Sequence, residues 1–321
     1  MNGAFLHTAI MLIAAIGGLA IGCLVDVSSA AILIEPLLIA MLFVIFLCVD
    51  VSEVRRAFTN IRFTMTALLI NFVWTPIFAL MLGMIFSEVD VRIGLMMLLV
   101  TPCTDWYLVF TAAAKGNVVQ SSSILPFNLI LQIVLMPVYL MLFFDVQISL
   151  DMSGLVMSMA MILAIPFLAA LAVRLLMPRV AAVGRLGSGM IERGDLLQLM
   201  FLCAAIVAMF ASESAELLDH WELFLALLIP LAVFFAVNYV VADVLSKIQR
   251  FDYRDATSLI FTSMARNSPL SLAIAVVAFP DSPLILLVLV IAPLIELPIL
   301  SFAAGYRSRK LTGIVIRKLS P

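Results

Sequence analysis

The sequence predicts an all-α integral membrane protein with ten transmembrane helices. Its 321 residues are 65% hydrophobic and 12% charged, with a mean hydropathy of +1.23, whereas soluble proteins are roughly 45–50% apolar and about 25% charged. A spanning helix needs about 20 apolar residues, so ten spans use roughly 200 residues and leave only short connectors. This arithmetic excludes a water-soluble globule and leaves no room for a sizeable soluble domain.

Apolar runs separated by charged or turn-forming residues define the predicted spans. The first run is expected to be a retained helix and not a cleaved signal peptide, because no Lys or Arg precedes it. Longer connectors are expected at 145–151 and 179–193. The predicted spans are 4–25, 31–50, 61–86, 92–114, 118–144, 153–176, 195–212, 221–246, 255–279 and 283–305.

The basic residues predict the orientation of these spans. Sixteen of the 18 Lys and Arg residues fall on the side that holds both termini, Arg92 falls on the opposite side, and Arg266 lies inside a span. Because basic residues gather in the cytoplasm, both termini are expected there, with 306–321 as a basic cytoplasmic tail held at the lipid headgroups. The formal net charge of −2 argues against nucleic-acid binding, since neutralising phosphates requires an excess of basic residues.

The chain divides into two halves of five spans, 1–145 and 153–305. Five spans per half give related halves opposite orientations, an arrangement found in many secondary transporters. Asp90-Val-Arg92 opens the fourth span and Asp252-Tyr-Arg254 opens the ninth. The expected architecture is therefore two inverted five-helix repeats.

Proline-containing polar clusters interrupt the fourth and ninth spans. The fourth carries TPCTD at 101–105 and the ninth carries ARNSP at 265–269, each near the middle of its apolar run. Proline removes a backbone donor, so a helix break is expected at both places. Paired broken helices expose backbone dipoles that can hold a polar solute; the alternative is two ordinary proline kinks whose polar groups satisfy each other.

Three ionisable residues lie inside spans. Asp105 and Arg266 would each cost roughly 2.5–3.5 kcal/mol at the centre of an isolated helix, so neither is expected to face lipid. They either form an ion pair or contact the solute directly. Glu296, in the tenth span, is a candidate proton carrier because burial disfavours an ionised carboxylate; the alternative is a neutral, hydrogen-bonded glutamic acid without a transport role.

Cys103 is the candidate soft ligand. The four cysteines form no CxxC pair, so neither a zinc site nor a disulfide framework is expected. Cys103 lies at a helix break, where backbone dipoles and Arg266 would favour the thiolate; otherwise it is a small buried hydrophobe, the interpretation we give Cys48 and Cys203. Asn128 is a further candidate to reach this central site.

Motifs of the common enzyme classes are absent from the sequence. It contains no GxxxxGK[ST] loop and no HExxH or other protease signature. We therefore expect a protein that is not an enzyme, needs no cofactor and transports a solute with the energy of an ion gradient.

Four stretches resemble the arsenical-resistance permeases, which belong to the bile acid/sodium symporter superfamily. They are TPCT at 101–104, Arg266-Asn267, LSLAIAV at 270–276 and IELP at 295–298. The resemblance extends loosely over residues 30–305. It implies that the fourth and ninth spans are broken and cross, and that the helices divide into a panel and a core.

The resemblance also implies a function, export of trivalent metalloid by proton antiport. Cys103 would be the thiolate ligand of arsenite or antimonite and Glu296 the proton carrier. A monomer or homodimer in the cell membrane is expected, with metalloid, protons and lipid as its partners. The other expected solute-binding residues are Thr104, Asp105, Asn128, Arg266 and Asn267.

Sodium- or proton-coupled symport of a small organic anion is the alternative, with Arg266 as the carboxylate anchor. The sodium-coupled relatives typically have a glutamate at the position of Thr262 and a glutamine at that of Arg266. A fixed cation and a missing carboxylate disfavour a sodium site. Asp105, where many arsenite permeases have an apolar residue, leaves the solute open.

Overall fold

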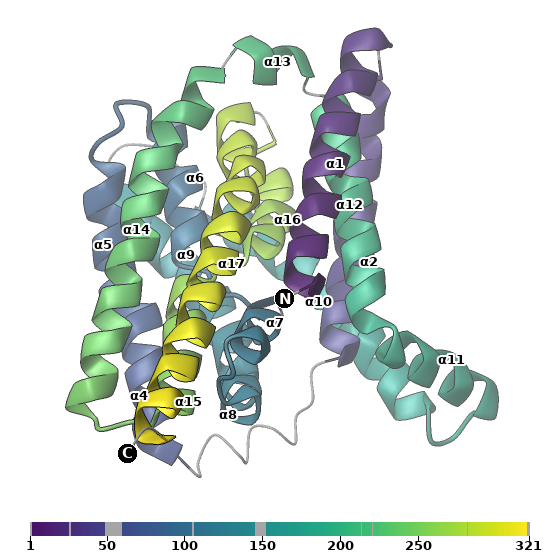
Figure 1. The fold of residues 1–321 in the computed structure, drawn as a ribbon. Coiled ribbons are helices and arrows are strands. Elements are labelled where there is room, and N and C mark those ends of the chain that lie inside the picture. The colour runs from purple at the N-terminus through teal and green to yellow at the C-terminus, as the bar shows by residue number, and fades with distance from the viewer. Residues whose placement is uncertain are drawn as a thin grey trace.

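The structure, a computed structural model, describes residues 2–25, 27–48, 60–104, 106–144, 152–212, 214–219, 221–280 and 282–319. Within these ranges every regular element is a helix (Figure 1). The predicted all-α class is therefore confirmed. The predicted connector at 145–151 lies outside the described residues.

The five predicted spans of the first half all coincide with helical segments. Two of these segments change character along their length: the second begins as a 3₁₀ helix, η1, and the third contains a π-helical turn, η3. The elements are α1 (Asn2–Leu24), η1 (Ser28–Leu33), α2 (Ile34–Cys48), α4 (Ile61–Leu69), η3 (Ile70–Trp74), α5 (Thr75–Gly83), α6 (Val89–Leu99), α7 (Trp106–Ala113), α8 (Val118–Ser123) and α9 (Leu125–Phe144).

The second half is also helical at each predicted span. Its predicted ninth span, like the predicted fourth, is divided into two short helices. The elements are α10 (Met152–Leu176), α11 (Ala181–Glu192), α12 (Gly194–Ser212), α13 (Ser214–Asp219), α14 (Trp221–Ile248), α15 (Tyr253–Met264), α16 (Ser268–Ala278) and α17 (Pro283–Leu319).

Two segments outside the predicted spans are helical. Helix α11 occupies most of the predicted connector 179–193 and is bent by 71° from the apolar helix that follows. Exposed Arg185 and Leu186 give α11 an amphipathic surface, which suits a helix lying along the membrane interface. Helix α17 continues through the predicted tail as far as Leu319, and the cytoplasmic location of the tail stays a prediction. Both segments lack a long apolar run, the feature on which the span prediction depended.

Four helical segments among the described residues are long and apolar enough to cross a membrane. A fifth is added if the bent pair Ala181–Glu192 and Leu196–Ser212 counts as one span. The protein is thus a multi-pass membrane protein, while ten crossings in two inverted repeats remain a prediction. The four segments are Ile61–Gly83, Val118–Phe144, Trp221–Ile248 and Pro283–Leu311.

The helices pack in two groups (Figure 1). Helix α12 packs against α1 and α2, and α2 packs against α10; these four helices form the right side of the view, and the segments from α4 to α9 and from α14 to α17 form a second group. Helix α16 joins the groups by packing against α2 and α10, and α17 packs against α1. The two broken segments both belong to the second group.

Small residues allow close helix contacts in each group. A Cβ atom added at Gly18 would lie 2.7 Å from the Val207 carbonyl oxygen, and one at Gly22 would collide with Ala211, so the GxxxG face of α1 lies directly on α12. In the second group, a Cβ at Gly94 would lie 3.0 Å from the Ile285 carbonyl oxygen. Gly94 therefore lets α17 approach α6 near the fourth-span break.

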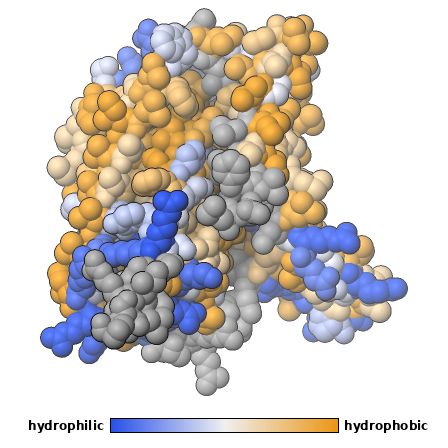
Figure 2. Space-filling model, in the orientation of Figure 1, coloured by the Kyte–Doolittle hydropathy of each residue, from blue (hydrophilic) through white to orange (hydrophobic). Residues whose placement is uncertain are grey.

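Side-chain polarity varies from one end of the molecule to the other. Figure 2 shows hydrophobic residues over most of the visible surface and a concentration of hydrophilic residues at the end where α11 lies. Exposed Lys247, Arg250 and Arg254 lie where α14 meets α15, and exposed Arg185 lies on α11. These residues belong to the side that the sequence predicts to be cytoplasmic; the orientation itself stays a prediction.

Candidate functional site

The interruptions of the predicted fourth and ninth spans meet as a short antiparallel pair of backbone segments. Pro102 lies opposite Arg266 in an isolated β-bridge. The Cys103 N–H donates to the Ala265 carbonyl oxygen at 3.0 Å, and the Asn267 N–H donates to the Thr101 carbonyl oxygen at 2.7 Å. The two broken segments therefore cross, as the resemblance implied, and each satisfies backbone groups that the other leaves open.

Four helix ends surround this crossing. Helices α6 and α15 end there, and α7 and α16 begin beyond it. The Asn267 side chain caps α16, because its Oδ1 accepts from the Leu270 N–H at 3.1 Å, and its Nδ2 donates to Thr104 Oγ1 at 3.0 Å. One side chain thus fixes the start of α16 and joins it to the opposite interruption.

A hydroxyl pair forms a second link between the broken segments. Thr101 Oγ1 and Ser271 Oγ are 2.7 Å apart, and each hydroxyl is 2.9 Å from the Met97 carbonyl oxygen. Both side chains are fully buried. The last turn of α6 is therefore held to the first turn of α16.

The Arg266 guanidinium lies at the carboxyl ends of both α6 and α15. Nη1 donates to the Leu99 carbonyl oxygen at 2.9 Å, Nε donates to that of Met264 at 3.1 Å, and Nη2 donates to that of Ser263. Nη2 also donates to Asn71 Oδ1 at 3.2 Å. Arg266 is only 3% exposed, so its charge is compensated by the negative ends of two helix dipoles.

Asn71 is a member of this site that the sequence did not indicate. It lies in the π-helical turn η3, is fully buried, and provides the only side-chain oxygen among the guanidinium acceptors that the described residues show. π-helical turns are frequent at functional sites because they displace a side chain from the regular helical position. A polar residue in an apolar run was the available signal, but it is equally typical of ordinary hydrogen bonding between helices.

Glu296 reaches the crossing from α17. Its Oε1 accepts a hydrogen bond from the Arg266 backbone N–H at 2.8 Å, and the residue is 5% exposed. Pro293, one turn earlier, cannot donate to the Leu289 carbonyl oxygen, and the Ser268 hydroxyl donates to that oxygen instead. Helix α17 is thus joined to the ninth-span break at two neighbouring points.

Cys103 is buried at the same crossing and is 5% exposed; none of the four cysteines forms a disulfide. Thr104 follows it and accepts from Asn267. Asp105 lies outside the described residues, so its pairing with Arg266 stays a prediction. Asn128 is fully buried on α9, where neither polar atom of its amide has a hydrogen-bond partner; its participation also stays a prediction.

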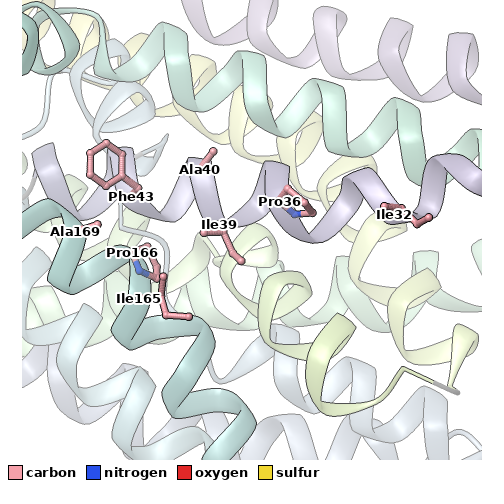
Figure 3. Close-up of a pocket in the computed structure, with 8 residues that line it drawn as sticks. All are labelled: Ile32, Pro36, Ile39, Ala40, Phe43, Ile165, Pro166 and Ala169. Carbon is pink, nitrogen blue, oxygen red and sulfur yellow. The ribbon is translucent and has the colours of Figure 1, made fainter.

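The described part of the chain also contains an apolar groove, and it contains no metal-binding cluster. No group of three or more His, Cys, Asp or Glu residues could hold a metal ion there. A groove of about 550 Å³ between α2 and α10 has only apolar lining residues, among them Pro36, Phe43 and Pro166 (Figure 3). A groove lined by apolar side chains gives a hydrophilic solute no polar side chain to bind.

A sequence model of the sodium bile acid symporter family matches residues 35–220, more than half of the chain. The protein belongs to this family. It is therefore a secondary transporter in a membrane and not an enzyme, and the family membership implies a transported solute.

Two bacterial proteins are similar to this chain in sequence over most of its length. The chain is 21% identical to the arsenical-resistance protein Acr3 of Corynebacterium glutamicum over 277 residues, which cover 82% of this chain and 74% of the relative. It is 28% identical to the uncharacterized protein YbaS of Bacillus subtilis over 240 residues, which cover 73% of this chain and 76% of that relative. The resemblance to arsenical-resistance permeases is thus confirmed as a distant homology.

Proposed function

We propose that this symporter-family protein exports trivalent metalloid, arsenite or antimonite, in exchange for protons. The observation that carries the proposal is the presence of a buried thiol, Cys103, and a buried carboxyl group, Glu296, at one crossing of broken helices. The distant homology to an arsenical-resistance protein supports the choice of solute.

The chemistry of the solute matches a single thiol. Arsenite and antimonite are neutral hydroxides near pH 7, and their trivalent centres exchange hydroxide for thiolate sulfur, a soft ligand. In this step a sulfur–metalloid bond forms, a bond from the metalloid to hydroxide breaks, and the thiol proton leaves with that hydroxide as water. Because one sulfur holds the metalloid less tightly than several would, the reverse reaction can release it on the other side.

Proton coupling is assigned to Glu296. Its carboxyl group bonds to the backbone of the ninth-span interruption, so a change in its protonation acts directly on the crossing. We propose that the α1, α2, α10 and α12 group and the remaining helices move relative to each other as panel and core, and that a proton from outside resets the carrier. The inverted repeats at 1–145 and 153–305, the cytoplasmic termini and a monomeric or homodimeric state belong to the same proposal.

Organic-anion symport with Arg266 as the carboxylate anchor is the second candidate. A bidentate anchor needs two parallel N–H groups of the guanidinium. Nε and both terminal nitrogens of Arg266 already donate to protein oxygens. These bonds disfavour a solute-binding role for Arg266 and with it the second candidate.

Metalloid tolerance tests the role of the thiol. Metalloid-sensitive bacteria that express the protein should grow at higher arsenite or antimonite concentrations than cells with an empty vector, and Cys103→Ser should abolish this gain. Cys203→Ser, a change at a half-buried cysteine of α12, is the matched control and should keep it. Full tolerance with Cys103→Ser at equal membrane expression contradicts the thiol mechanism.

Transport in inside-out membrane vesicles tests the role of Glu296. Arsenite uptake should rise when a proton gradient is imposed, and Glu296→Gln should reduce that gradient-driven component by about tenfold or more, equivalent to about 1.4 kcal/mol. Glu222→Gln, a change of an exposed carboxyl group at the start of α14, should have no effect. An undiminished response of the Glu296→Gln protein to the gradient removes the proton role. Uptake of labelled organic anions with sodium would support the second candidate.

A further inference from the structure

We infer that the Arg266 guanidinium is a built-in cation that takes the place of the sodium ion implied by the family's name. The inference concerns the coupling ion and depends only on the geometry of the crossing, so it holds for either solute considered above. Its consequence is a carrier that neither binds nor needs sodium.

Half-helix ends determine where a cation is favourable in such a transporter. The carboxyl ends of broken helices carry partial negative charge, and in secondary transporters the unwound carbonyl groups there coordinate sodium or protons. The crossing brings two such ends together, those of α6 and α15. Between them the structure places a charged side chain of the protein.

The acceptors of the Arg266 guanidinium are a set of oxygens typical of a hard cation. Backbone carbonyl and amide oxygens are the ligands that hard metal ions prefer, and the guanidinium engages one such set. It consists of the carbonyl oxygens of Leu99, Ser263 and Met264 and the side-chain oxygen of Asn71.

The residues present do not fit a sodium ion in addition to this guanidinium. Arginine stays protonated in proteins, so its positive charge is permanent and would repel a second cation at the same oxygens. The Phe234 ring lies 5.3 Å from the guanidinium carbon and adds a cation–π contact. The Glu296 carboxyl group accepts a hydrogen bond from the Arg266 backbone N–H.

A permanent cation at this place differs from sodium in one functional respect. Sodium binds and leaves during a transport cycle, so its gradient can drive transport, whereas a guanidinium attached to the chain crosses no membrane and couples to no gradient. In this structure the carbonyl groups at both half-helix ends are already compensated by the guanidinium. The driving ion must therefore act elsewhere than at these oxygens.

Thermal unfolding of the purified full-length protein in detergent tests the inference without any transported solute. The wild-type protein should have the same Tm in 150 mM NaCl, KCl and N-methylglucamine chloride, within about 1 °C. Arg266→Gln should lower the Tm by about 5 °C or more, and 10 mM NaCl or guanidinium chloride should restore part of that loss, whereas N-methylglucamine chloride should not. Arg266→Lys should fall between the wild type and Arg266→Gln.

Arg307→Gln is the matched control. Arg307 is a second buried arginine, 2% exposed, but it bonds to the side chains of Thr257 and Asp243, away from the ends of the broken helices. Its replacement should lower the Tm without producing a response to sodium or guanidinium. A small-cation response confined to Arg266→Gln therefore identifies the carbonyl set and not a general loss of charge.

Two results would overturn the inference. One is a wild-type Tm that rises with sodium, or wild-type binding of radioactive ²²Na⁺ that exceeds that of empty detergent micelles. The other is a folded Arg266→Gln protein that does not respond to any small cation. If Arg266→Gln does not fold, the wild-type sodium measurements decide. Failure of metalloid tolerance with a sodium-independent Tm would contradict the proposed function alone.

Discussion

The two helix interruptions follow similar backbone paths but differ in the chemistry of their side chains. The first contains Cys103 and Thr104, and the second contains Arg266 and Asn267. Two backbone hydrogen bonds flank the bridge between Pro102 and Arg266, and each interruption contributes one N–H donor and one carbonyl acceptor to them. The comparison indicates a division of roles in which the first interruption supplies the candidate ligand for the solute and the second stabilises the crossing.

This division has a physical basis. The guanidinium of the second interruption compensates the carboxyl end of α6 as well as that of its own helix, α15, and the Asn267 amide caps α16 while bonding to Thr104. Among the described contacts, the Thr104 hydroxyl provides the acceptor for Asn267. Changes at the second interruption should therefore affect the stability of both.

The largest effect is expected from Asn71→Leu. The change removes the side-chain acceptor of Arg266 Nη2 and should cost about 1.5–3 kcal/mol, the range for hydrogen bonds to charged groups. The free energy of unfolding in mixed micelles is the measurement. Asn71→Asp keeps an acceptor and should retain stability. Asn238→Leu is the control, since the described hydrogen bond of that buried asparagine is a donation to the Phe234 carbonyl oxygen of its own helix; equal losses for the two leucine variants would contradict a specific role for Asn71.

A smaller effect is expected from Asn267→Ala. It removes the cap of α16 and the bond to Thr104, and loss of an N-cap costs about 1 kcal/mol. Thr104→Val removes only the bond between the interruptions and should cost less in the same unfolding measurement. Asp252→Ala, which removes the exposed cap of α15, provides the cost of a cap alone. If Thr104→Val costs as much as Asn267→Ala, the two interruptions contribute equally and the proposed division is wrong.

The smallest effect is expected from the hydroxyl pair. Thr101→Val and Ser271→Ala each break the contact between these side chains, so a double-mutant cycle should give a coupling energy of about 0.6 kcal/mol, the average for such pairs in membrane proteins. Additive losses, with a coupling energy of zero within error, would mean that the backbone pairing alone joins α6 to α16.

The sequence predicted the positions of both breaks but not their full set of contacts. Proline within an apolar run indicates an interruption because its effect on backbone hydrogen bonding is local. The clusters at 101–105 and 265–269 could thus be identified, and with them Cys103 and Arg266. The bond from Ser268 to the Leu289 carbonyl oxygen could not be predicted, because the acceptor is freed by Pro293 in another helix.

Asn71 and Arg266 illustrate the same limit. A charged residue in an apolar run predicts that the residue avoids lipid, and Arg266 is buried within the protein as expected. Its partners were left open between Asp105 and a solute, whereas the described contacts are with Asn71 and helix-end carbonyl groups. Carbonyl groups are identical at every position, so a sequence cannot indicate which of them will accept.

The sequence by itself determined the membrane class, the helical segments, the two interruptions and the identity of the buried thiol, carboxyl and guanidinium groups. These features depend on the length and composition of short stretches of sequence, because the transfer of apolar residues into the membrane and the backbone geometry of proline are local properties. The tertiary structure alone decided that Arg266 compensates Leu99, 167 residues away, and that Glu296 of α17 meets the same crossing. Such contacts arise only when helices distant in sequence pack together, because the packing selects which polar groups lose access to water and must bond to each other.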